Sequence, residues 1–139
     1  MKILAIDFGQ KRMGFAIGDT SIKTAVPISQ INRKDLKLDI DHIKNIIYEY
    51  DINKIILGYP LNMDGTKSQI TEKVENFSKL LRKKIPEIDI EFIDERLTSF
   101  EAEEILKPHK PNHKKRKGIL DSISALIILK TFMEKNEKQ

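Results

Sequence analysis

The first third of the chain alternates short apolar runs with turn residues, which is the pattern of β-strands joined by tight turns. Residues 3–6 (ILAI) and 15–17 (FAI) are two such runs, with a glycine-bracketed turn between them. Residues 24–31 (TAVPISQI) indicate a third strand. Pro27 assigns this strand to a sheet edge or a bulge, because proline lacks the N–H of a ladder hydrogen bond. The pattern therefore predicts an opening antiparallel meander.

An apolar stripe at helical spacing follows over residues 35–50. Its positions recur every three or four residues and are Leu36, Ile40, Ile43, Ile47 and Tyr50. His42 lies beside this stripe, so we expect it at the surface. The next run, 54–59 (KIILGY), is almost wholly apolar, as expected of a strand that is covered on both faces.

Capping-box spacings mark the starts of two further helices. Thr66 and Gln69 have the spacing at which two side chains satisfy free backbone donors, and the apolar face of the helix that follows runs over 70–81. Thr98 and Glu101 repeat this spacing and predict a short second helix.

The last strand is predicted over 88–93 (IDIEFI), and a final helix over about 117–134 precedes a charged tail, 135–139, that we expect to fray.

The order is three strands, helix, strand, helix, strand and helices. It predicts one α/β domain over 1–139, a mixed five-stranded sheet in which three antiparallel strands are followed by parallel βαβ units, with helices on both faces. The carboxyl ends of the parallel strands gather at one sheet edge, where ligand sites form.

The composition excludes several classes of site. The 139 residues contain no cysteine, which rules out disulfides, thiolate metal sites and thiol nucleophiles. No apolar run approaches the roughly 20 residues that a bilayer span requires, and no signal peptide precedes the first strand. We therefore expect a soluble, cytoplasmic protein that does not bind membranes.

Positive charge is concentrated in residues 107–117 (KPHKPNHKKRK), which we call the basic segment. This segment contains six Lys or Arg and no acid, whereas the whole chain has a net charge of +4, so the rest of the chain is acidic. Pro108 and Pro111 predict a loop here, because proline interrupts a helix. Such a loop favours a phosphate backbone as partner, and the alternative is a disordered basic loop without a partner.

Acidic residues stand at three places that the predicted topology brings to one edge. Asp7 ends the first apolar run, and Asp94 and Glu95 follow the last strand. Asp121 precedes apolar residues at helical spacing, so it points from the core-facing stripe of the last helix. From the pattern alone two alternatives stay open: Asp7 opens a turn, and Asp121 interacts favourably with the helix dipole.

A converging set of carboxylates predicts a site for a hard cation. Asp7, Glu95 and Asp121 would bind one or two Mg²⁺ or Mn²⁺ ions through oxygen. The lack of cysteine and the peripheral histidines argue against zinc. Two such ions about 3.5–4 Å apart are the usual arrangement for in-line phosphodiester cleavage.

Five stretches of the chain carry a family resemblance. They are IDFGQKRMGFAIGD (6–19), AVPI (25–28), ILGYPLNMDG (56–65), FIDERLTSFEAEEIL (92–106) and LDSISALIIL (120–129). In this order they resemble the YqgF (RuvX) family of RNase H-fold proteins, whose members are described as Holliday junction resolvases or pre-16S rRNA processing nucleases. The stretches cover most of the chain, and their combination is far more specific than any one of them.

The resemblance implies an RNase H-like fold and a divalent-metal nuclease that acts on branched DNA or on structured RNA such as precursor 16S rRNA. Asp7, Glu95 and Asp121 match the catalytic and metal-binding acids of the family. Asp94 would share a metal or support the site from outside, and one sequence leaves open which acid of the 94–95 pair turns inward. Gly9 and Gly14 would let the backbone approach the site.

Recognition of nucleic acid is expected to depend on its backbone. Arg12 and Arg96 would contact phosphate or hold a neighbouring acid, two roles that remain open. Phosphate contacts are also assigned to the cations just before Asp121, namely Lys110, Lys114, Lys115, Arg116 and Lys117. Aromatic residues make up only 6% of the chain and none lies in the basic segment, which argues against base stacking there. Asn62 and Asp64 also match the family pattern, without an assigned role.

Two classes of function fit these features. One is the nuclease, and the other is a non-catalytic nucleic-acid-binding factor in ribosome maturation or transcription that keeps the fold and the basic segment. Replacing Asp7 with Asn separates them, because it would remove turnover from a nuclease and leave a binding factor intact. We expect a monomer or a weak homodimer, since no exposed apolar stripe indicates a dimer interface.

Overall fold

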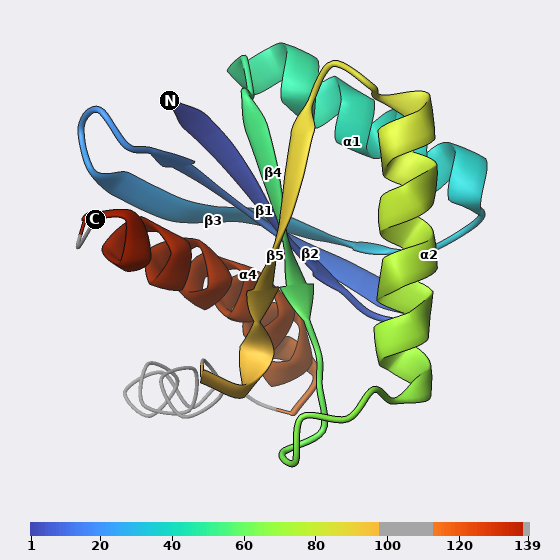
Figure 1. Cartoon of the computed structure of the whole chain (residues 1–139). Helices are drawn as coiled ribbons and strands as arrows, with labels where there is room; N and C mark the ends of the chain where they lie inside the picture. Colours follow the sequence, from blue (N-terminus) through green and yellow to red (C-terminus); the bar gives the residue numbers. More distant parts are fainter. Residues whose placement is uncertain (98–112, 138–139) are drawn as a thin grey trace.

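Five strands form one mixed sheet in the order β3-β2-β1-β4-β5 (Figure 1). The computed structural model describes the backbone of residues 1–97 and 113–137 and the side chains of residues 1–96 and 122–136. The strands are β1 (Lys2–Phe8), β2 (Arg12–Asp19), β3 (Thr24–Asn32), β4 (Lys54–Tyr59) and β5 (Asp89–Asp94). β1 pairs antiparallel with β2 and parallel with β4, β2 pairs antiparallel with β3, and β4 pairs parallel with β5. This topology confirms the predicted meander and parallel units.

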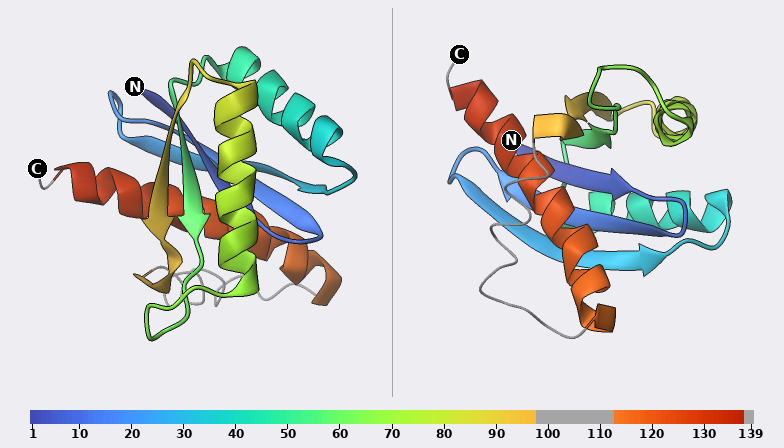
Figure 2. Two further views of the ribbon diagram at one scale, coloured as in Figure 1. Left: turned by 45° about the vertical axis from the view of Figure 1, so that its right-hand side comes forward. Right: turned by 90° about the horizontal axis from the view of Figure 1, so that it is seen from below.

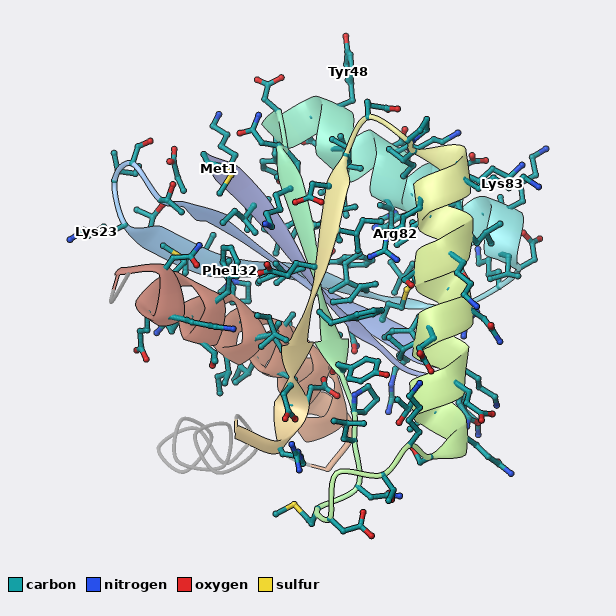
Figure 3. All side chains as sticks on the ribbon, in the orientation of Figure 1. Met1, Lys23, Tyr48, Arg82, Lys83 and Phe132 are labelled. Atoms are coloured by element: carbon teal, nitrogen blue, oxygen red, sulfur yellow. The ribbon has the colours of Figure 1, made fainter. Side chains whose placement is uncertain are left out.

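Helices cover both faces of the sheet, as predicted (Figures 1 and 2). They are α1 (Leu36–Tyr50), α2 (Gln69–Lys84), the short 3₁₀ helix η1 (Glu95–Leu97) and α4 (His113–Glu137). The core cluster under α1 and α2 includes Leu4, Ile6 and Phe8 of β1, whereas Ile3 and Ala5 pack with α4 on the other face. Phe132 of α4 lies against the strands (Figure 3).

Alternation along β1 decides where its acidic residue lies. Successive side chains of a strand point to opposite faces. Because Ile3 and Ala5 belong to the α4 face, Asp7 belongs to it as well. The carboxylate therefore stands at the carboxyl end of a central strand, on the face that α4 covers.

The starts of α1 and α2 follow from side-chain caps. Asp35 caps α1 by accepting a hydrogen bond from the backbone N–H of Leu38 at 2.8 Å, as the helix predicted from residue 35 requires. α2 is capped by a reciprocal Ser68–Thr71 box, so the predicted Thr66–Gln69 box is wrong. The reason is local, because the Thr66 hydroxyl donates to Asp64 at 2.6 Å inside the preceding loop.

Two expectations for α1 are also corrected. Its buried positions are Asp39, Ile40, Ile43 and Ile46, whereas the predicted stripe members Leu36 and Tyr50 are exposed. Asp39 is buried because Arg33 pairs with it at 3.1 Å. His42 is half-buried rather than superficial, with its ring 5.3 Å from that of Phe15 and its Nε2 atom buried.

The edge strand β3 agrees with its sequence prediction, whereas the last helix begins earlier than predicted. β3 lies at the sheet edge and has an irregular register opposite Phe15 and Ala16, next to Pro27, as proline predicts. α4 begins at His113, so residues 113–117 of the basic segment are helical and the loop expected over all of 107–117 is wrong there. The short helix expected after Thr98 lies outside the described residues.

Within the described ranges, no helix is long and apolar enough to cross a membrane.

Candidate active site

Two carboxyl groups meet across β4, on the face of the sheet that α4 covers. Asp7 stands opposite Gly14 near the end of β1, and Glu95 is the first residue after β5. β4 separates these two strands in the sheet, and its Gly58 leaves room for the Glu95 side chain to reach Asp7. A β-carbon at residue 58 would overlap the Glu95 carboxyl and would lie 2.7 Å from Ile128 Cδ1 of α4.

The proximity of the two acids changes the pKa of one of them. The pKa of Glu95 is raised from 4.5 to about 9, first by burial, then by the negative charge of Asp7, by the hydrogen bond to Asp7 and by the charge of Asp94. A buried carboxyl beside a carboxylate holds a proton at neutral pH because both cannot ionise without a counter-charge. The pair therefore presents a place for a cation.

Asp94 and Arg96, the residues on either side of Glu95 in the sequence, form a separate ion pair. Arg96 Nη2 lies 2.7 Å from Asp94 Oδ2, and its Nε lies 3.1 and 3.0 Å from the two carboxylate oxygens. The Arg96 backbone N–H also donates to Asp94 at 3.0 Å. These hydrogen bonds lower the pKa of Asp94 despite partial burial. Glu95 therefore faces Asp7, whereas Asp94 faces Arg96.

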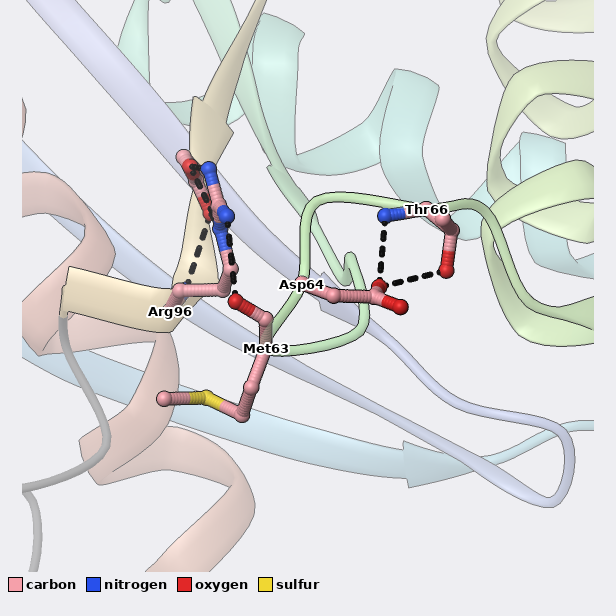
Figure 4. A network of polar contacts seen from close by, with 5 residues as sticks. Met63, Asp64, Thr66 and Arg96 are labelled. Carbon is pink, nitrogen blue, oxygen red and sulfur yellow. Dashed lines mark hydrogen bonds and ion pairs between the residues drawn. The ribbon is translucent and has the colours of Figure 1, made fainter.

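Arg96 also contacts the loop between β4 and α2. Its Nη1 donates to the carbonyl of Met63 at 3.5 Å (Figure 4). Within that loop Asp64 accepts hydrogen bonds from the backbone N–H and the hydroxyl of Thr66 at 2.9 and 2.6 Å, and these bonds lower the pKa of Asp64. Asn62 donates to the Thr66 hydroxyl at 2.9 Å. Asn62 and Asp64 thus shape the loop. This is a role that the sequence pattern did not assign to them.

The glycines predicted at the site hold the β1–β2 hairpin. The Gly9 N–H donates to the carbonyl of Arg12 at 2.9 Å, and a β-carbon on Gly9 would lie 2.7 Å from that oxygen. Gly14 is the register partner of Asp7. Arg12 is the half-buried first residue of β2. Only a residue without a side chain permits the tight turn at Gly9.

The remaining predicted residues belong to α4 or precede it. Asp121 and residues 114–117 lie on this helix, but their side chains are outside the described set, and Lys110 lies outside the described residues. Ala125, Ile128 and Phe132, which follow Asp121 at helical spacing, are buried. Among the side chains of residues 1–96 and 122–136, no three acids or histidines form a metal-binding cluster.

Nearly the whole length of the chain can be matched to known proteins. Residues 1–135 match the RuvX family, described as Holliday junction resolvase. The chain belongs to the RuvX family. Its relative "Putative pre-16S rRNA nuclease" from Buchnera aphidicola subsp. Baizongia pistaciae is 43% identical over 132 residues, which are 95% of this chain and 96% of the relative. A protein of the same name from Natranaerobius thermophilus is 36% identical over 135 residues, 97% of this chain and 95% of the relative.

Solved structures share the fold of this RuvX chain. The fowlpox virus Holliday junction resolvase aligns with a TM-score of 0.59 at 15% identity, over 97% of this chain and 99% of the resolvase. RuvC of Thermus thermophilus aligns with a TM-score of 0.56 at 7% identity, over 98% of this chain and 97% of RuvC. These similarities confirm the RNase H-like fold expected from the sequence.

Two residues near the site of this RuvX chain were missed by the sequence reasoning. Gly58 had a signal, because a glycine inside an apolar strand often marks a close approach by another group. Arg33 had none in the spacing alone. Its Nη1 donates to the Gly9 carbonyl at 3.1 Å and its Nε to buried Asp39 at 3.1 Å, so it ties the turn after Asp7 to α1.

We expect Arg96→Ala to remove both the ion pair with Asp94 and the hydrogen bond to the β4–α2 loop. The pKa of Asp94 should rise toward its ordinary value, because the carboxylate loses the hydrogen bonds and the positive charge of Arg96, and the midpoint of urea unfolding should fall. Carboxyl NMR titration and urea unfolding measure the two effects. Lys67→Ala, which removes the surface pair with Glu75, serves as the control and should leave the pKa of Asp94 unchanged. An unchanged Asp94 pKa in Arg96→Ala would contradict this role.

Proposed function

We propose that this RuvX protein is a divalent-metal-dependent nuclease that hydrolyses phosphodiester bonds in structured nucleic acid, either at the ends of precursor 16S rRNA or in Holliday junctions. The observation that carries the proposal is the half-buried Asp7–Glu95 pair built over Gly58. Relatives named as pre-16S rRNA nucleases support the first substrate. A fowlpox virus resolvase and a Thermus thermophilus RuvC solved with Holliday junction DNA share the fold and are compatible with the second.

The donor set of the pair fits Mg²⁺ or Mn²⁺. Both groups offer only oxygen, which hard cations prefer, and a cation would supply the counter-charge that Glu95 lacks because of its burial and its proximity to Asp7. We assign Asp7, Glu95 and Asp121 to hold one or two ions. Asp121 is included because it precedes three buried residues of α4 at helical spacing. The bound metal would polarise the phosphate and activate water.

The neighbouring residues would position this set. Asp94 binds Arg96 through both carboxylate oxygens, so we assign it to fixing the turn that carries Glu95 rather than to the metal. Glu95 would give up its proton when the cation binds, because the ion supplies the missing counter-charge. Arg33 would hold the turn after Asp7 in place. Arg12 remains a candidate phosphate contact.

The cations at the start of α4 are proposed to bring the phosphate backbone to the carboxylates. Reversing the charges of residues 114–117 should weaken nucleic-acid binding and flatten its salt dependence, by about 0.9 in log–log slope for each duplex phosphate that the protein no longer neutralises. A salt titration of binding to labelled duplex measures the slope. The same slope in the variant and in the unmodified protein would show that the basic segment does not contact the nucleic acid.

Cleavage of end-labelled single-stranded RNA, duplex DNA and a four-way junction tests the proposed activity. Each reaction is run with Mg²⁺ or Mn²⁺, with chelator, and with Asp7→Asn protein. We expect metal-dependent cutting that disappears in the variant, and the preferred substrate then selects between the two physiological roles. Binding without cutting, equal in both proteins, would instead identify a non-catalytic maturation factor. A cytoplasmic monomer or weak homodimer with nucleic acid as its partner completes the proposal.

A further inference from the structure

A cleft runs between α1 and α2, on the sheet face opposite α4. It consists of two adjoining cavities of about 420 and 440 Å³, and Leu36 of α1 and Leu80 of α2 line both of them. Phe8 and Phe77, whose rings lie 4.6 Å apart, line the first cavity. We call these two cavities the α1–α2 cleft.

Lysines surround this apolar floor. Lys73 lines the first cavity, and Lys37, Lys44 and Lys84 line the second, where Asp41 is the one acidic side chain among the lining residues. Within the described part of the chain, none of these four lysines forms an ion pair or a hydrogen bond through its side chain. Four lysines against one acidic side chain make the cleft complementary to a polyanion.

The cleft begins at the turn that follows Asp7. Arg33, whose side chain is 18% exposed, lines the first cavity and is fixed by Asp39 and by the Gly9 and Gln10 carbonyls. Its guanidinium also stacks over the Phe8 ring at 4.4 Å. Gln10 lines the same cavity, so the cleft and the Asp7–Glu95 pair lie on either side of one hairpin turn.

We propose that the α1–α2 cleft binds the backbone of the nucleic-acid strand flanking the scissile bond, with Lys73 and Lys84 as its principal phosphate contacts. The inference rests on the proposed nuclease function and extends it to a second binding surface, on the sheet face opposite α4. Lys73 and Lys84 are about 16 Å apart along α2 at 1.5 Å per residue. At 3.4 Å per nucleotide of a duplex strand, this distance spans about five nucleotides.

A pair of matched variants on one helix tests the assignment. Lys73→Glu with Lys84→Glu reverses the two cleft charges of α2. Lys79→Glu with Lys83→Glu reverses two exposed charges that do not line either cavity. Lys83 projects away from the rest of the molecule (Figure 3). Both variants change the net charge equally, so a difference between them reports position rather than total charge.

Binding is measured in chelator to labelled hairpin RNA, duplex DNA and a four-way junction, so that no substrate is cut. We expect the cleft variant to bind about tenfold more weakly and its log–log salt slope to fall by about 1.8, whereas the control changes less than about twofold. A loss of affinity that is confined to RNA or to DNA identifies which of the two the cleft binds. Lys73→Gln with Lys84→Gln, which adds no negative charge, should give a smaller loss in the same direction.

Equal weakening in both charge-reversal variants, or unchanged binding in the cleft variant, would overturn the proposal. Circular dichroism checks that each variant is folded before binding is compared. The nuclease function is tested separately by cutting substrates too short to reach from the carboxylates into the cleft. Failure of that cleavage with a positive binding result would reject the catalytic assignment alone, and the reverse pattern would reject the cleft alone.

Discussion

Asp7→Asn is expected to stabilise the metal-free protein while it removes cleavage. Burial is the largest cause of the raised pKa of Glu95 and the charge of Asp7 is the next, so deleting that charge should lower this pKa and raise the free energy of unfolding in chelator at neutral pH. Metal-dependent cleavage should fall at least about 10²–10³-fold, because a charge that stabilises the transition state is lost with the ion. Thermal unfolding in chelator and initial cleavage rates measure the two effects.

Because stability should rise while activity falls, unfolding cannot explain the loss of cleavage. A variant that loses activity by unfolding would lose stability as well. Glu87→Gln, which neutralises an exposed acid before the start of β5, at the opposite end of that strand from Glu95, is the control and should change neither quantity. A destabilised Asp7→Asn protein would contradict the repulsion between Asp7 and Glu95.

The burial of Glu95, together with the negative charge of Asp7, makes the stability of the metal-free protein depend on pH. Folding raises the pKa of Glu95 from 4.5 to about 9, so the folded protein keeps a proton that the unfolded chain loses above about pH 4.5. This contribution to stability is fully present below about pH 4.5 and is lost progressively as the pH rises towards 9. Urea unfolding in chelator across that interval should show the fall, and Glu95→Gln should flatten it.

Gly58→Ala is expected to disturb the Asp7–Glu95 pair, although Gly58 lies on β4, a strand that supplies no acid to that pair. The new β-carbon would overlap the Glu95 carboxyl and approach Ile128 to 2.7 Å, so Glu95 must move away from Asp7 or α4 must shift. Overpacking of this kind costs about 1–3 kcal/mol of stability. Cleavage should fall about 10–100-fold, the usual effect of disturbing the support of a metal ligand. Urea unfolding and cleavage rates measure both losses.

A double-mutant cycle identifies the contact responsible. In a Glu95→Ala background the methyl of Gly58→Ala has one overlapping neighbour fewer, so its cost in stability should be smaller than in the unmodified protein. Equal costs in the two backgrounds would attribute the whole effect to Ile128. Full cleavage by Gly58→Ala would contradict the placement of Glu95 beside Asp7.

Much of the fold could be predicted because hydrophobic spacing determines it. The run 54–59 is β4 residue for residue, and the helix expected from Asp35 is α1. Position in the sheet was also predictable, because Pro27 restricts β3 to an edge. Local competition for one hydroxyl was not predictable. Thr66 has the spacing of a helix cap, but Asp64 takes its hydroxyl, and Ser68 caps α2 instead.

The candidate site was predictable in its residue types but not in its pairing. A one-residue change of position moves a side chain to the other face of a strand, so sequence alone could not choose between Asp94 and Glu95. The structure resolves the pair because β5 ends at Asp94 and η1 redirects the chain at Glu95. The burial of His42 depended on its tertiary contact with Phe15, which helical periodicity does not encode.

The position of β5 at the edge of the sheet has a dynamic consequence. Edge strands open locally at a lower free energy than central ones, and Glu95 would leave with β5 while Asp7 stays in the centre of the sheet. Any ligand that binds only the closed arrangement makes this opening rarer by mass action. Amide hydrogen exchange along β5 would therefore slow when Mg²⁺ or Mn²⁺ is added, so an edge strand would report occupancy of the proposed metal site.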